Sequence, residues 1–136
     1  MKLLINIDVP ELAPAIAFYC AALGLTLTRT LDDDVAELGG ASSTIYLLRK
    51  ATHSSPADNI APGRTYARHW TPVHVDVVVE NLEAAAARAL SAGAVQESEC
   101  VVWAGSRCIT FSDPFGHGFC LIEFRDGSGT YSATPA

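Results

Sequence analysis

The sequence predicts an α+β fold made of two tandem βαβββ modules, and three observations lead to this prediction. Over 72–79, valines alternate with His74, Asp76 and a further valine, which is the period of a half-buried strand. An alanine-rich helix pattern follows at 82–92. The same order occurs 70 residues earlier, where a strand pattern at 3–9 precedes a helix pattern at 12–23. One supersecondary unit is therefore repeated along the chain.

The first module continues with short strands after its helix. Its first strand carries isoleucine and valine on one face and Asn6 and Asp8 on the other. Gly24 is expected to end the helix, because glycine adopts a left-handed cap without steric cost. Three further strands are predicted, at 25–29, 35–38 and 44–49.

The second module has equivalent start and stop signals. Asn81 is suited to cap its helix, and Gly93 is suited to end it. Further strands are expected at 95–103, 107–111 and 119–124. Before the last of these, Asp113-Pro114-Phe115-Gly116 combines an Asx acceptor, a proline with a fixed φ and a flexible glycine. This combination predicts a tight turn.

One domain is expected over 1–125, with module one at 1–50, a linker at 51–71 and module two at 72–125. The linker lacks hydrophobic periodicity, yet it ends with His69 and Trp70, which leaves its role open. The small, polar residues of 126–136 are expected to form a flexible tail.

Composition and charge exclude several classes of function. The 136 residues are 49% hydrophobic, which is enough for a well-formed core. A formal net charge of −6 without a basic cluster argues against a nucleic-acid partner. No apolar run reaches the ~20 residues of a membrane span, and no signal peptide opens the sequence, so a cytoplasmic location is expected. The four cysteines form no C-x-x-C pair, and free thiols are predicted.

The order of elements and two motifs give the chain a family resemblance. FYCAALGL closes the first helix, and FSDPFGHGFCLIEF ends the second module. With two βαβββ units, this pattern resembles the vicinal oxygen chelate superfamily, the group of glyoxalase, bleomycin-resistance proteins and extradiol dioxygenases. The resemblance implies an open, cup-shaped mixed sheet with the helices on the outside. It also implies a homodimer.

The same resemblance bears on cofactors. Enzymes of the superfamily hold one divalent metal in the cup through four ligands, typically His or Glu. The resemblance places these positions at Leu4, Tyr46, His74 and Cys120. Leucine cannot bind a metal, and tyrosine with cysteine replaces two carboxylates poorly, so we expect no metal cofactor. The alternative is one divalent metal ion whose ligands are regrouped around His74, Asp76, Asp8 or His69.

Polar side chains on strand faces that meet inside the cup favour a wet or ligand-filled cavity. Buried polar groups without partners cost roughly 1–3 kcal/mol each, so a dry core would not hold several of them. His74 is the candidate catalytic residue for proton transfer, and a structural hydrogen bond is its alternative role. Arg107 could clamp a ligand carboxylate or form a surface ion pair. The predicted ligand-binding set is Asn6, Asp8, Tyr46, His74, Asp76, Trp103, Arg107 and Cys120.

Three classes of function remain open on these grounds. The first is a metal-independent protein that binds an unidentified small molecule, which we favour because the metal-ligand set is broken. The second is a metal-dependent lyase, isomerase or dioxygenase with a rearranged site around His74. The third is a non-catalytic module for dimerisation or partner binding. The sequence does not identify the ligand.

Overall fold

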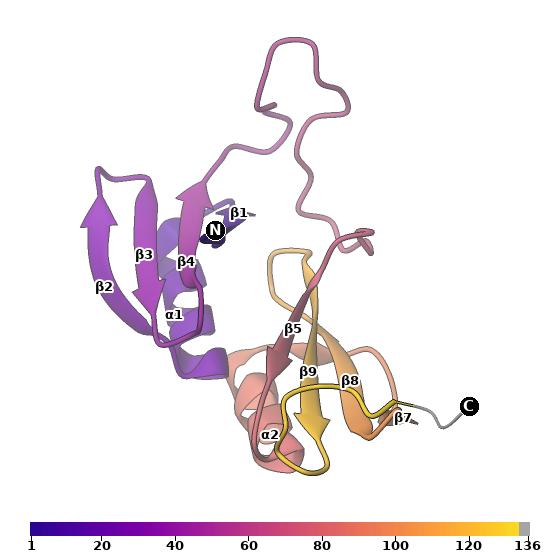
Figure 1. Ribbon diagram of the computed structural model, residues 1–136. Helices are drawn as coiled ribbons and strands as arrows, with labels where there is room; N and C mark the ends of the chain where they lie inside the picture. Colours follow the sequence, from indigo (N-terminus) through magenta and orange to yellow (C-terminus); the bar gives the residue numbers. More distant parts are fainter. Residues whose placement is uncertain (134–136) are drawn as a thin grey trace. The chain divides into compact units, whose positions relative to one another are not determined.

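The computed structural model describes residues 1–133, and its contacts divide the chain into two compact units. Unit 1 comprises residues 1–67, and unit 2 begins at Arg68. Both units have the same plan of one helix against a mixed sheet (Figure 1). Within the described residues, no helix is long and apolar enough to cross a membrane.

Unit 1 is a four-stranded sheet with one helix. Its elements are β1 (Leu4–Val9), α1 (Leu12–Leu23), β2 (Thr26–Leu31), β3 (Val35–Gly39) and β4 (Thr44–Arg49). The strand order is β1-β4-β3-β2, in which β1 is parallel to β4 and the other neighbours are antiparallel. Gly24 ends α1 in the left-handed conformation at φ 68°, as its position after the helix pattern predicts.

The alternation of the strands decides which face of this sheet meets the helix. Val9, Leu38 and Leu47 are fully buried, and Phe18 and Tyr19 of α1 are almost fully buried. Helix α1 contacts β2, β3 and β4. Burial of these side chains supplies most of the driving force for folding, at roughly 1.5–3 kcal/mol for each large one.

Unit 2 repeats this plan with an additional short strand. Its elements are β5 (Val75–Val78), α2 (Leu82–Ala92), β6 (Val95–Gln96), β7 (Val101–Trp103), β8 (Ser106–Ser112) and β9 (Gly118–Phe124). The strand order is β5-β9-β8-β6, and β7 also pairs with β8. Helix α2 contacts β9. The side chain of Asn81 accepts from the backbone N–H of Ala84, so the predicted cap is present.

The turn before β9 forms as its sequence predicts. A side-chain oxygen of Asp113 accepts from the backbone N–H groups of Phe115 and His117, each at 2.8 Å. Gly116 has φ 92°, which suits glycine. The Asp113 side chain is buried because the turn itself supplies hydrogen-bond donors.

Most predicted strands differ from the observed ones by one or two residues at their ends, and two differ more. The single strand expected at 95–103 is two short strands, β6 and β7, which pair with different parts of β8. The strand expected at 72–79 forms only over Val75–Val78, so His74 precedes it. Pro72 lacks a backbone N–H, which makes it a poor ladder residue.

The pairing register confirms the repeat. In unit 1, Asn6 of β1 lies opposite Tyr46 of β4. In unit 2, Asp76 of β5 lies opposite Cys120 of β9. Asn6 and Asp76 are 70 positions apart, so the two parallel strand pairs are equivalent residue by residue. The predicted α+β class with two βαβββ modules is confirmed.

The predicted boundaries at 50 and 72 stay predictions, since the division into units falls between Ala67 and Arg68. It assigns most of the predicted linker to unit 1 and its end, with His69 and Trp70, to unit 2. The flexibility expected for 126–136 also stays a prediction. Residues 134–136 lie outside the described residues, and Tyr131 contacts Trp103 and Phe124.

Candidate functional site

Each sheet has one face that its helix does not cover, here called the open face. Strand alternation places Asn6, Asp8 and Tyr46 on the open face of unit 1. The open face of unit 2 carries Asp76, Cys120 and Thr110, because these residues lie opposite one another in register. Five of the residues singled out from the sequence, Asn6, Asp8, Tyr46, Asp76 and Cys120, therefore lie on the two open faces.

On the open face of unit 1, Glu37 is the centre of a hydrogen-bonded cluster. Its carboxylate accepts from the Tyr46 hydroxyl at 2.8 Å, from Thr28 at 2.9 Å and from the Arg29 guanidinium at 3.1 Å. These donors, Arg29 first and then Tyr46, lower the pKa of Glu37 from its ordinary value of 4.5 to about 2. The Tyr46 hydroxyl therefore serves as an internal donor.

Asp8 is also paired within unit 1. The Nε atom of Arg64 lies 2.6 Å from Oδ2 of Asp8, and Arg64 also donates to Ser54 at 3.1 Å. Both charged side chains are largely buried, with 17% of the Arg64 side chain and 32% of the Asp8 side chain exposed. The loop that contains Arg64 thus neutralises the Asp8 carboxylate, which leaves it less suited to an external cation.

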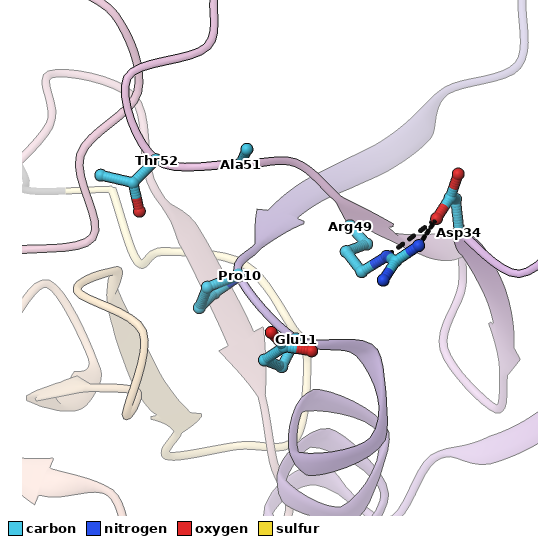
Figure 2. Close-up of a pocket in the computed structure, with 6 residues that line it drawn as sticks. All are labelled: Pro10, Glu11, Asp34, Arg49, Ala51 and Thr52. Atoms are coloured by element: carbon cyan, nitrogen blue, oxygen red, sulfur yellow. Dashed lines mark hydrogen bonds and ion pairs between the residues drawn. The ribbon is translucent and has the colours of Figure 1, made fainter.

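A hollow of about 500 Å³ lies at one end of this unit, lined by Pro10, Glu11, Asp34, Arg49, Ala51 and Thr52 (Figure 2). Its guanidinium, from Arg49, donates to Asp34 at 2.8 Å. Because the cation is already satisfied by a carboxylate, this hollow offers an acidic ligand little attraction.

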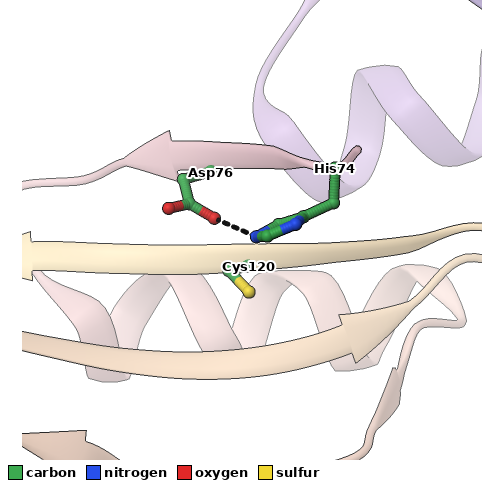
Figure 3. A group of neighbouring side chains, drawn as sticks. All are labelled: His74, Asp76 and Cys120. Atoms are coloured by element: carbon green, nitrogen blue, oxygen red, sulfur yellow. Dashed lines mark ion pairs between the residues drawn. The ribbon is translucent and has the colours of Figure 1, made fainter. Parts of the chain in front are cut away.

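In unit 2, three chemically different side chains converge on the open face: His74, Asp76 and Cys120 (Figure 3). One ligand atom from each lies within 4.8 Å of the others. Nε2 of His74 is 3.1 Å from Oδ1 of Asp76. This contact assigns the proton to Nε2 in the neutral imidazole and leaves Nδ1 as the acceptor nitrogen. The group can therefore accept hydrogen bonds from a ligand and exchange a proton with it.

The segment of residues 68–73, here called the arm, packs against His74. The Trp70 ring lies 4.7 Å from the His74 ring, and the Arg68 guanidinium lies 5.6 Å from the centre of the Trp70 ring. Arg68 is in turn paired with Glu97 at 2.6 Å. A Cβ atom at Gly118 would lie 2.5 Å from Trp70, so only glycine lets the arm approach β9 this closely.

The thiols on this face are held in their protonated form. Burial raises the pKa of Cys120, and burial with the neighbouring Cys120 raises the pKa of Cys108 to about 12. The Cys120 sulfur lies 3.4 Å from the Thr110 hydroxyl. Since the thiolate is the reactive form, neither thiol is suited to act as a nucleophile at neutral pH.

A second hollow adjoins this group on the same face of unit 2. It has a volume of about 370 Å³, and its walls include Val101, Trp103, Cys108, Thr110, Ile122 and Tyr131. Thr110 links it to the group, because this residue lines the hollow and contacts Cys120. The open face thus has a polar end at His74 and Asp76 and an aromatic end at Trp103 and Tyr131.

The predicted ligand-binding residues are divided between the two units. His74, Asp76 and Cys120 lie together, and Trp103 lines the adjoining hollow. Asn6, Asp8 and Tyr46 lie on the open face of unit 1. Arg107 alternates with Cys108 on β8 and therefore points to the α2 side, where it pairs with Glu83 at 2.6 Å and Glu123 at 2.9 Å. This pairing matches the surface ion pair weighed for Arg107 from the sequence.

The residues that sequence reasoning missed include Glu37, Cys108, Thr110 and Tyr131. Cys108 and Thr110 carried a usable signal, because alternation along β8 places both on the face opposite Arg107. Glu37 alternates in the same way on β3, opposite Tyr46. Tyr131 gave no such signal, since it lies beyond the last strand.

The three donors of unit 2 can be tested for their fit to a metal ion. Imidazole nitrogen, carboxylate oxygen and thiolate sulfur are all zinc ligands, and catalytic zinc sites use three protein ligands. Two features oppose the fit. The Cys120 thiol must first lose a proton that burial retains, and the Asp76 carboxylate already accepts from Nε2 of His74. Of the positions implied by the resemblance, Leu4 offers no donor, and Tyr46 donates to Glu37.

Comparison with solved structures shows what the fold is similar to. A lactoylglutathione lyase from Agrobacterium tumefaciens matches with a TM-score of 0.65 and 17% identity, over 94% of this chain and 96% of that one. The fosfomycin resistance protein FosX from Listeria monocytogenes matches with a TM-score of 0.68 and 17% identity, over 90% and 92%. A glyoxalase/bleomycin resistance protein/dioxygenase from Nocardioides matches with a TM-score of 0.65 and 20% identity, over 100% and 89%.

No curated protein sequence matches the chain. At the family level, however, residues 4–122 match the glyoxalase-like domain, a stretch that runs from the first residue of β1 into β9. The match includes both repeats and both open faces. The chain therefore belongs to the glyoxalase-like domain family, within the vicinal oxygen chelate superfamily.

Proposed function

We propose that this protein binds a small organic molecule on the open face of unit 2 and does so without a resident metal ion. The observation that carries the proposal is the juxtaposition of the His74–Asp76–Cys120 group with a hollow of about 370 Å³. Ligand pockets are mostly apolar, span roughly 300–1,000 Å³ and contain a few placed polar groups. The hollow and the adjoining group fit this description.

The polar end sets the chemistry of the ligand. The Asp76 carboxylate and Nδ1 of His74 both accept hydrogen bonds, so the ligand supplies donors such as a hydroxyl or a protonated amine. The net charge of −6 favours a neutral or cationic molecule over an anion. The protonated thiols of Cys108 and Cys120 add polarisable contacts without adding charge.

A fragment screen by ¹H–¹⁵N NMR tests the proposal. Fragments that carry an amine or hydroxyl should shift the amide signals of residues 74–76, 108–110 and 120. His74→Ala should abolish or weaken the binding of these fragments, whereas His53→Ala, a matched histidine variant in unit 1, should leave it unchanged. Hits confined to other surfaces would contradict the proposal.

A metal-dependent lyase, isomerase or dioxygenase is the second candidate, favoured by the three donor atoms that lie within 4.8 Å of one another. His74, Asp76 and Cys120 would hold the ion, which would supply Lewis-acid chemistry when bound. We rank this candidate second because Cys120 retains its proton and because Leu4 and Tyr46, the unit 1 positions implied by the resemblance, are not metal ligands of the usual type.

Elemental analysis of purified protein separates the two candidates. Metal-independent binding predicts well under one zinc, nickel, iron or manganese ion per chain after dialysis. One ion per chain that disappears in Cys120→Ser and in Asp76→Asn would establish the second candidate.

The proposal extends to a cytoplasmic homodimer. Strand β2 lies at one end of its sheet with all six residues exposed, which leaves an unpaired edge within unit 1. Closed twofold association is a common way to cover such edges. Analytical ultracentrifugation at tens of micromolar should give the mass of two chains, and a stable monomer would contradict this part of the proposal.

A further inference from the structure

The segment after β9 turns back onto the open face of unit 2. Asp126 begins the reversal by accepting from the backbone N–H of Ser128 at 3.0 Å. Gly127 and Gly129 adopt φ values of 69° and 72°, which allow a close turn. The backbone N–H of Ser132 then donates to the carbonyl of Ala104 at 2.8 Å, which tethers the segment beside the turn between β7 and β8.

This reversal places the Tyr131 ring between two other aromatic rings. The Tyr131 ring centre lies 5.0 Å from that of Trp103, with the ring planes at 60°. It lies 5.1 Å from Phe124 in an edge-to-face arrangement at 78°. These distances are typical of favourable aromatic pairs. Phe124 is only 8% exposed although it lies on the open face, so the segment covers it.

Tyr131 is also a wall of the hollow. It lines the hollow together with Trp103, while Val101 and Ile122 supply the rest of the apolar surface. Burial raises the pKa of Tyr131, and the negative charge of Asp76 adds to this effect. The hydroxyl therefore stays protonated, and it is close enough to Asp76 to interact with its charge. Tyr131 therefore faces the space that the proposed ligand would occupy.

We infer that Tyr131 is a specificity-determining residue of the ligand site and, with Trp103, selects ligands that carry a flat aromatic ring. This inference rests on the proposed function. A ring that enters the hollow would contact two aromatic side chains, which favour another planar π-system over a saturated ring of similar size. A donor group on the same ligand would reach towards Asp76 and His74 past Thr110.

Two probes of similar size test the inference: 2-naphthylmethylamine and its saturated analogue, decahydro-2-naphthylmethylamine. Binding to the full chain is measured by ¹H–¹⁵N NMR titration, with the Trp103 indole N–H as the reporter. Wild type should bind the aromatic probe more tightly. Tyr131→Ala should weaken aromatic binding about three- to tenfold, the range for one aromatic pair, and leave the saturated probe nearly unchanged.

Two variants control for folding and for the hydroxyl. Tyr131→Phe keeps the ring and should retain wild-type preference, which separates ring stacking from a merely structural role of the segment. Thr130→Ala changes the neighbouring side chain and should bind both probes as wild type does. Dispersed NMR spectra of each variant verify that the sheet is intact.

The outcomes distinguish the inference from the proposed function. If the probes bind at His74 and Asp76 but Tyr131→Ala binds the aromatic one as tightly as wild type, the inference is wrong and the proposed site stands. Equal affinity of wild type for the two probes has the same consequence. If neither probe shifts any signal on the open face of unit 2, both the inference and the proposed function fail.

Discussion

The two units share a scaffold but use their open faces differently. Tyr46 of unit 1 and Cys120 of unit 2 occupy equivalent register positions, opposite Asn6 and Asp76 respectively. Next to them, Glu37 in unit 1 is equivalent to Thr110 in unit 2. Unit 1 therefore has a carboxylate where unit 2 has a hydroxyl.

This difference determines what each face can bind. The Glu37 carboxylate collects Arg29, Tyr46 and Thr28 into an internal network, and Arg64 neutralises Asp8. In unit 2, the contact between Thr110 and Cys120 involves no charged group, and the Asp76 carboxylate lies beside the residues that line a hollow. The two repeats thus share the helix-facing core but differ in their open faces. The polar groups on the open face of unit 1 are paired with one another, whereas the open face of unit 2 is a candidate binding site.

The largest expected effect tests the shared scaffold. Leu47 and Leu121 occupy equivalent positions on the helix-facing side of β4 and β9 and are 0% and 1% exposed. Leu47→Ala and Leu121→Ala should each lower the free energy of unfolding by about 2–5 kcal/mol, because each leaves a cavity in a packed core. Urea denaturation followed by circular dichroism gives both values.

Leu48→Ala is the control for this pair, because Leu48 is only half-buried on the other side of β4. Its effect should be clearly smaller. A loss below about 1 kcal/mol for either core variant would mean that the two helix-facing cores are not equivalent.

The next largest effect concerns His74 on the open face of unit 2, the face that differs from its counterpart in unit 1. His74→Ala should weaken binding of a fragment found by screening by about 1–3 kcal/mol, the range for loss of a hydrogen bond to a charged or placed group. It should change the free energy of unfolding by less than about 1 kcal/mol, because a third of the His74 side chain is solvent-exposed. Calorimetric titration and thermal melts supply the two numbers. A variant that binds as wild type but melts several degrees lower would make His74 a structural residue.

A smaller effect follows from the arm that braces His74. The unit 1 position equivalent to Gly118 is Thr44, so the strand pairing shared by the two units tolerates a side chain at this position. At Gly118, a methyl group would lie 2.5 Å from Trp70 and 2.6 Å from Arg68. Gly118→Ala should therefore displace the arm and cost about 1 kcal/mol of stability.

The displacement can be read from the His74 ring protons, which should lose the upfield shift caused by the Trp70 ring. Gly39→Ala, the same change in a strand of unit 1, should leave these protons unaffected. Unchanged His74 resonances in Gly118→Ala would show that the arm does not position the imidazole.

These comparisons also show which features could be predicted from the sequence. Alternation and helix caps are local, so the repeat, both helices and the Asp113 turn could be identified before any coordinates were known. The proximity of His74 and Asp76 follows in the same way from their spacing of two residues in an extended pattern. The pairing of Arg107 could not be predicted, because the choice between a ligand clamp and a surface pair depends on the distance to Glu83 in α2.

Tyr131 illustrates the other limit. Its segment is short and polar, which is typical of a flexible tail, and no periodicity indicates a packed side chain. Its position results from the reversal at Asp126 and from one backbone hydrogen bond to Ala104. Whether this bond forms depends on the path of the turn that begins at Asp126, and this path is a tertiary property.

The smallest predicted effect is the pH dependence contributed by the network of unit 1. The pKa of Glu37 falls from 4.5 to about 2 in the folded chain, mainly because Arg29 and then Tyr46 donate to it. A lowered folded-state pKa stabilises the fold fully above the unfolded value, and this stabilisation is lost as the pH falls from about 4.5 towards 2. Glu37→Gln lacks the contribution, so its melting temperature should be below that of wild type at pH 7.

The difference in melting temperature should narrow as the pH falls from 4.5 towards 2, because the carboxyl is protonated first in the unfolded chain and, near pH 2, in the folded chain as well. It should also shrink at high salt, because 61% of the Arg29 side chain is exposed to solvent and the pair is screened. Arg29→Gln removes the first donor and should reproduce most of the effect, while Tyr46→Phe should reproduce a smaller part. A gap that stays constant from pH 7 to pH 3 would show that Glu37 acts through packing alone, and unit 1 would then lack the charge network that distinguishes its open face from that of unit 2.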